Sequence, residues 1–153
     1  MEIKFSIPLQ ETITKRHSVR TYDNKPLLPE DREKLMEYTK TLSNPFGEGV
    51  KFHIIEKGVS DKGEKLGTYG VIKGATTFLG VSVPNTEFGL LAAGYEFENL
   101  ILYATAIGLG TVWLAATFSR DNFAAAMGIK KEELFPAISP VGYPAAKKAS
   151  RNL

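Results

Sequence analysis

The chain has 153 residues, 43% of them hydrophobic and 24% charged, which is typical of one globular domain with its own core. Its formal net charge of +2 lacks the dominant basic field of nucleic-acid-binding proteins, so we expect no such partner. The absence of cysteine excludes disulfides, thiolate metal ligands and a cysteine nucleophile. His17 and His53 are too few for a multi-histidine metal site, so no metal is expected. The N-terminus lacks an apolar signal-peptide segment, which favours a cytoplasmic location.

Two helices are expected near the N-terminus. The first covers residues 8–15, where Leu9 and Ile13 lie one turn apart on the same side. The second covers residues 29–42, because a proline followed by two acidic residues suits the first turn of a helix. The expected buried stripe of this second helix consists of Leu35, Tyr38 and Leu42.

Two strands and one long helix are expected in the middle of the chain. Residues 50–54 alternate between apolar and polar and predict a strand, and residues 78–83 form a second, mostly apolar strand. Between them, residues 58–70 are rich in glycine and charge and read as a loop. The helix over residues 87–107 is apolar around most of its circumference, so we expect it in the interior or at a subunit contact.

Residues 100–118 contain no charge, and a run of 19 such residues raises the question of a membrane span. Glycines at 108 and 110 interrupt the run, so a buried helix followed by a short strand or extended turn at 111–114 fits better. We therefore expect no membrane contact. A helix from Ser119 to Met127 and a strand over 137–143 complete the domain.

The span of residues 16–20 carries two arginines, a histidine and a serine. In an extended segment, alternate residues point to the same side, so Arg16, Ser18 and Arg20 would converge on one anion. An exposed basic turn is the alternative interpretation of such a short pattern. His17 is the histidine better placed to touch a ligand, whereas His53 lies in a strand pattern and is interpreted as structural.

Common catalytic motifs are missing from the sequence. The glycines at 108 and 110 do not form a dinucleotide-binding fingerprint, because they follow a helix and Trp113 occupies the position of the third glycine. Glu96 and Glu98 are two residues apart on a helix and do not share a face, which argues against a paired-carboxylate site. We assign no catalytic side chain.

The order of these features resembles the FMN-dependent nitroreductase family along most of the chain. The matching segments are residues 16–22, residues 70–75, residues 98–113 and residues 135–144. The resemblance implies an α+β, three-layer nitroreductase-like fold, in which helices flank a mixed central β-sheet and one helix is long and central. It implies a single flavin-binding domain over residues 1–153, and a homodimer that holds two FMN molecules at its interface.

The resemblance also assigns the cofactor site. The residues that match the positions holding the flavin phosphate and ring edge are Arg16, His17, Ser18 and Arg20. The segment whose backbone lies against the reactive side of the isoalloxazine matches Trp113, Leu114, Ala115 and Ala116. Small side chains there would let the backbone approach the ring, although simple packing explains the two alanines as well. Looser matches to the pyrimidine edge are Thr68, Tyr69 and Gly70.

The implied activity is transfer of hydride from NADH or NADPH through the flavin to a nitroaromatic, a quinone or a similar small acceptor. Some relatives carry an acidic residue at the position of Ala115, and relatives are usually longer, with further cations that complete the phosphate site. Here Lys147, Lys148 and Arg151 are the remaining cations near the C-terminus. Two alternatives stay open: a flavin-binding dimeric module without turnover, and an unrelated small-molecule binder that uses Arg16 and Arg20 on an acidic ligand.

Overall fold

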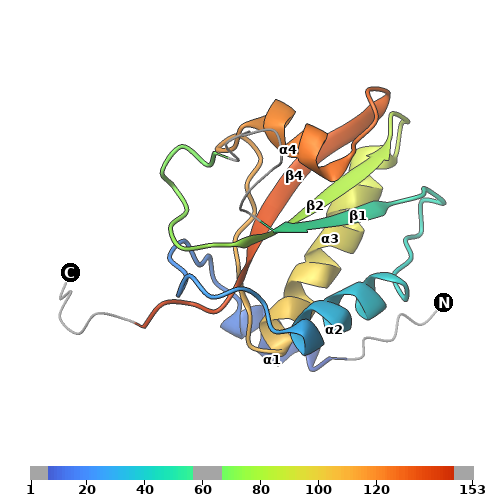
Figure 1. The fold of residues 1–153 in the computed structure, drawn as a ribbon. Helices are drawn as coiled ribbons and strands as arrows, with labels where there is room; N and C mark the ends of the chain where they lie inside the picture. The colour runs from blue at the N-terminus through green and yellow to red at the C-terminus, as the bar shows by residue number, and fades with distance from the viewer. Residues whose placement is uncertain (1–6, 57–66, 147–153) are drawn as a thin grey trace.

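A computed structural model of the chain describes residues 7–56 and 67–146. Within these ranges it contains helices and strands that confirm the expected α+β class (Figure 1). In chain order they are α1 (Leu9–Lys15), α2 (Pro29–Thr39), β1 (Lys51–Glu56), β2 (Thr77–Pro84), α3 (Gly89–Ala106), β3 (Gly110–Thr111), α4 (Arg120–Met127) and β4 (Glu133–Gly142).

The sheet has the strand order β1-β2-β4-β3, and each pair of neighbouring strands is antiparallel. β2 and β4 occupy the centre and are almost fully buried, because helices cover both of their faces. The parallel contacts come from single residues of the N-terminal segment: Ser18 pairs with Thr111, and Thr21 pairs with Lys73. In the described residues, the parallel part of the expected mixed sheet is limited to these bridges.

The two faces of the sheet pack against different helices. Successive residues of a strand point to opposite faces, so Phe78 and Leu79 belong to separate apolar clusters. Phe78 packs edge-on against Phe123 of α4, with ring centroids 5.1 Å apart. Leu79 lies in the cluster that contains Phe97 of α3. Figure 1 accordingly shows α4 on one side of the sheet and α3, with α2, on the other, which gives three layers.

The first two helices differ in detail from the sequence prediction. α1 begins at Leu9, and its buried residue is Thr12, whose hydroxyl donates to the Pro8 carbonyl at 2.8 Å. Ile13, one turn after Leu9, is 54% exposed. α2 ends at Thr39 because the next three N–H groups bond three residues back and form a turn. Leu42 still packs against the core, as expected.

The later elements also shift at their ends. α3 begins at Gly89, two residues after the predicted start, and Leu91 on its first turn is exposed. β4 begins at Glu133, four residues earlier than predicted. Sequence patterns missed this start because Pro136 interrupts the strand. The register of β2 and β4 shifts between Val81 and Val83, and a proline is tolerated at such a bulge.

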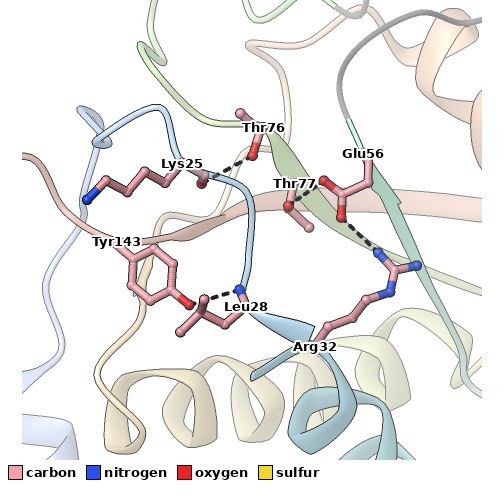
Figure 2. A network of polar contacts seen from close by, with 7 residues as sticks. All are labelled: Lys25, Leu28, Arg32, Glu56, Thr76, Thr77 and Tyr143. Carbon is pink, nitrogen blue, oxygen red and sulfur yellow. Dashed lines mark hydrogen bonds and ion pairs between the residues drawn. The ribbon is translucent and has the colours of Figure 1, made fainter. Parts of the chain in front are cut away.

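A polar network fixes α2 to the sheet (Figure 2). Arg32 of α2 donates to Glu56 of β1 at 2.8 Å, and Glu56 also accepts a hydrogen bond from the Thr77 hydroxyl at 2.9 Å. At the start of the helix, the Leu28 N–H donates to the Tyr143 hydroxyl at 3.1 Å. The network thus joins α2 to β1, to β2 and to the segment after β4.

The uncharged run at residues 100–118 is divided between the end of α3, the short strand β3 and the segment after it. No helix in the described parts of the chain is long and apolar enough to cross a bilayer.

Gly74 is required where the loop before β2 meets Tyr22. Its φ is +77°, and a Cβ there would lie 2.2 Å from the Tyr22 carbonyl oxygen, which is backbone and cannot rotate away. We expect Gly74→Ala to lower the free energy of unfolding by about 2–5 kcal/mol, from left-handed strain and steric overlap together. Gly70 has the same φ, and a Cβ added there would meet nothing within 4 Å, so Gly70→Ala is the matched control. It should cost only about 1–2 kcal/mol in a urea titration, and equal losses would contradict the overlap.

Candidate functional site

The arginine-rich span leaves α1 in an extended conformation. Arg16 follows the helix with φ −62° and ψ 129°, which lets the next residues pair with a strand. The Val19 N–H donates to the Thr111 carbonyl at 2.9 Å, and the Val19 side chain is buried in the core. A Cβ at Gly110 would lie 3.0 Å from Val19, so the two backbones approach closely. The span is therefore fixed against β3.

A second set of backbone bonds continues along the span. The Lys73 N–H donates to the Arg20 carbonyl at 2.9 Å, and the Tyr22 N–H donates to the Lys73 carbonyl at 2.8 Å. With Val19 facing inward, Arg20 is exposed, and Arg16 and Ser18 are half-buried. His17 is exposed, and its Nδ1 lies 3.1 Å from the Lys15 carbonyl oxygen. The predicted donors thus lie along one ordered strand-like segment.

The segment after β3 is held to β4 at successive residues. The Val112 N–H donates to the Ser139 hydroxyl at 3.0 Å. Leu114 exchanges two hydrogen bonds with Ile138, at 2.8 and 3.0 Å, and its side chain is buried. Leu114 is therefore an anchor of this segment, and its N–H is already used within the protein.

The neighbours of Leu114 are open to solvent. Ala115 and Ala116 are exposed, and Trp113 is 36% exposed. The Trp113 ring packs edge-on against Phe97 of α3, with centroids 4.8 Å apart. Because Leu114 is fixed and its neighbours are open, the segment presents the predicted Trp113 and alanine positions at the surface.

A third loop contacts the same region. The Ser119 N–H donates to the Gly67 carbonyl at 2.9 Å, and the Gly67 N–H donates to the Ser119 hydroxyl at 3.3 Å. Ser119 occupies the N-cap position of α4, but its hydroxyl makes no capping bond to the helix. These bonds bring residues 67–70 beside the segment that follows Ala116.

Within this loop, the three predicted residues differ in accessibility. Thr68 is 4% exposed, so its side chain offers almost no surface to a ligand. Tyr69 is 72% exposed and has φ 51°, a left-handed conformation that is uncommon for a residue other than glycine. Gly70 is exposed too, with φ 77°. Such backbone conformations concentrate at functional sites.

Glu98 of α3 lies in this region, although sequence patterns gave it no role. It is half-buried, and its Oε1 is buried without a hydrogen-bond partner in the described part of the chain. Burial raises the pKa of this carboxyl, while the nearby Arg16 charge and a hydrogen bond from the Trp113 side chain lower it. Glu98 therefore lies between the arginine span and the Trp113 segment.

Glu96 is separate from this region. It is buried, and Asn44 donates to its Oε2 at 2.5 Å. Burial also raises the pKa of Glu96, with the Asn44 hydrogen bond opposing it. The two carboxyl groups therefore contact different partners.

His53 is not part of this arrangement. His53 Nε2 lies 2.8 Å from the Ser82 hydroxyl inside the sheet, where burial lowers the pKa of the imidazole. Lys147, Lys148 and Arg151 lie outside the described residues. Sequence patterns assigned no role to Lys73 or Arg120, because each bonds to backbone groups of other segments. The Lys73 backbone bonds to Arg20 and Tyr22, and the Arg120 side chain bonds to the Ala115 carbonyl.

The titration of Glu98 gives a testable pH dependence. A carboxyl whose pKa is raised by folding stabilises the protein below the ordinary glutamate value and loses that contribution as pH rises through the folded pKa. Glu98→Gln removes this titration, so the stability of the wild type relative to the variant should fall as pH rises from about 4 to 7. The measurement is urea unfolding at several pH values, with Glu132→Gln as a control for loss of an exposed carboxylate. Parallel pH profiles for the wild type and Glu98→Gln would contradict the assignment.

Comparison with solved structures supports the fold that the site is built on. A nitroreductase family protein from Clostridium difficile 630 is 18% identical, with a TM-score of 0.72 over 93% of this chain and 87% of that chain. A nitroreductase with bound FMN from Bacteroides fragilis NCTC 9343 is 20% identical, with a TM-score of 0.70 over 95% and 94% of the two chains. An FMN-dependent nitroreductase from Clostridium difficile R20291 is 15% identical, with a TM-score of 0.71 over 94% and 92%.

No curated protein matches the sequence. Residues 8–152 match the sequence profile of the family described as "Putative TM nitroreductase". Because this match covers nearly the whole chain, the protein belongs to the nitroreductase family.

Proposed function

We propose that the protein is an FMN-dependent oxidoreductase that transfers hydride from NADH or NADPH to a nitroaromatic, a quinone or a similar electron-poor acceptor. The observation that carries the proposal is the ordered span of Arg16, Ser18 and Arg20, paired through Val19 with Thr111 next to the open Ala115–Ala116 segment. Membership of the nitroreductase family and the FMN named for two solved relatives support the same choice. The cytoplasmic location remains a prediction from the sequence.

The residues of the span fit the phosphate end of FMN chemically. Guanidinium groups and a hydroxyl are strong donors to phosphate oxygens, and arginine can grip two oxygens at once. Arg16, Ser18 and Arg20 would hold the phosphate, with His17 beside them. Since Val19 and Tyr22 are buried and their N–H groups are bonded, the protein's own contacts hold the backbone of the span.

The segment after β3 fits the ring end. Ala115 and Ala116 are exposed, and the Ala116 N–H donates no hydrogen bond to another described residue. A methyl side chain lets a flat ring approach the backbone, where this N–H has no partner among the described residues. The ring would be bordered by Trp113, next to Leu114, and by Tyr69 and Gly70 on the neighbouring loop. The Thr68 side chain is buried, so it would contribute only by fixing the conformation of that loop.

The chemistry that FMN supplies when bound is two-electron hydride transfer from a nicotinamide to the acceptor. The chain's own part is to bind the phosphate, orient the ring and leave one side of it open to the two substrates in turn. We assign no side-chain acid or base, so the acceptor would take its proton from solvent.

A visible spectrum of the purified protein with added FMN tests the proposal directly. We expect bound flavin whose absorbance near the visible maximum is lost when NADH or NADPH is added without oxygen, and restored by a quinone. Bound flavin that neither nicotinamide bleaches would favour a flavin-binding module without turnover. No binding of FMN would favour an unrelated binder of an acidic ligand.

The phosphate grip is tested by Arg16→Ala and Arg20→Ala. Each lost charge-assisted contact should cost about 1.5–3 kcal/mol of binding free energy, so the FMN dissociation constant should rise about tenfold or more. Fluorescence quenching of FMN measures this constant. Lys34→Ala removes an exposed cation on α2 and serves as the control, with no expected change. Unchanged FMN affinity in both arginine variants would refute the assignment.

We also propose a homodimer, in which part of α3 lies at the subunit contact. Phe88, Leu90 and Leu91 at the start of α3 are 42%, 56% and 55% exposed, and grouped apolar side chains of this kind mark interfaces. Light scattering at micromolar concentration should give the mass of a dimer. Leu91→Lys should shift it toward monomer, whereas Leu28→Lys, at an exposed leucine before α2, should not. A monomeric wild type would contradict this proposal.

A further inference from the structure

Arg120, the first residue of α4, connects two segments of backbone through its side chain. Its Nη1 donates to the carbonyl of Phe135 in β4, and its Nη2 donates to the carbonyl of Ala115. The guanidinium carbon lies 4.8 Å from the centre of the Phe118 ring and 6.0 Å from that of Phe135. Two carbonyls and two rings therefore define the position of this one cation.

The Phe135 carbonyl is a suitable fixed point. Phe135 lies in the stretch of β4 between Leu134 and Ala137, where the register with β2 shifts. Its side chain is buried, so this part of the backbone belongs to the core. A planar guanidinium can donate to two acceptors from adjacent nitrogens, whereas a lysine ammonium has no such fork.

The effect of Arg120 falls on the peptide between Ala115 and Ala116. Leu114, one residue earlier, is fixed by its two hydrogen bonds with Ile138. With the Ala115 carbonyl also fixed, the orientation of the following peptide plane is determined. In a planar trans peptide, the N–H points opposite to the carbonyl, so the Ala116 N–H is directed away from Arg120. Ala116 is exposed, and this N–H has no partner among the described residues.

We propose that Arg120 is a positioning residue of the flavin site, whose guanidinium fixes the Ala115–Ala116 peptide so that the Ala116 N–H is presented to the ring of bound FMN. The inference rests on the proposed function for its ligand. The hydrogen bonds of Arg120 to Ala115 and Phe135 are properties of the chain alone, so they are testable without flavin.

The first measurement uses the full chain without FMN. NMR order parameters of the Ala115 and Ala116 amides should be about 0.85 in the wild type and fall below about 0.6 in Arg120→Gln. Arg120→Lys keeps the charge but not the fork, and it should behave like Arg120→Gln. Lys131→Gln removes an exposed cation that lines the same surface depression as Arg120, and it should leave both amides unchanged.

The second measurement adds FMN to the same four proteins. If the Ala116 N–H contacts the ring, both Arg120 variants should raise the FMN dissociation constant about two- to tenfold, as loss of one amide hydrogen bond does. The visible absorption bands of the bound flavin should shift in both variants and not in Lys131→Gln. A purely structural role would instead lower the melting temperature and leave the affinity and spectrum of bound FMN unchanged.

Rigid amides in both Arg120 variants would overturn the inference, whatever FMN does. Mobile amides with unchanged FMN affinity and spectrum would overturn the positioning role while keeping the contacts. A wild type that binds no FMN would refute the proposed function and the positioning role with it, even if the amides become mobile as expected. Mobile amides together with weaker, spectrally shifted FMN would support the inference.

Discussion

Backbone hydrogen bonds of residues 18–22 join the N-terminal segment to three parts of the chain that are far apart in sequence. Val19 bonds to Thr111 after the long helix, Arg20 and Tyr22 bond to Lys73 before β2, and Tyr22 pairs with Pro144 after β4. Each connection joins residues that are far apart in sequence and closes a long loop, so the conformation of the span depends on how the rest of the fold places its partners. The candidate phosphate-binding span is therefore a product of the completed fold.

Close packing makes these connections possible and restricts what can replace their residues. Val19 and Tyr22 insert into the apolar cluster that also contains Phe78 and Phe123, on the α4 side of the sheet. Gly74 and Gly110 stand where a Cβ would meet Tyr22 and Val19. The same cluster holds Leu114, which anchors the segment before Ala115. Both ends of the candidate site are thus attached to one core, and a core substitution there should disturb ligand binding as well as stability.

Local patterns in the sequence predicted the class of most elements but not their ends. The alternation around Phe52 and the apolar run from Phe78 give β1 and β2, since strand periodicity depends only on neighbouring residues. The start of β4 was missed because Pro136 breaks the pattern, and only the bulge opposite β2 explains how the strand tolerates it. In α1, the packing buries Thr12 and leaves Ile13 exposed.

In the candidate site, too, the sequence predicts features that depend on neighbouring residues and misses those that depend on contacts between distant residues. The alternation of Arg16, Ser18 and Arg20 is visible in the sequence, because it needs only an extended backbone. Glu98 and Arg120 could not be assigned from sequence, since each acts on groups that only folding brings near: Glu98 on Arg16 and Trp113, Arg120 on two carbonyls. Glu98 Oε1 is buried without a partner among the described residues, which costs folding free energy. The same carboxyl lies near the charge of Arg16, which the ligand is also proposed to use. Glu98 and the phosphate of the proposed ligand would then both act on the positive charge of Arg16.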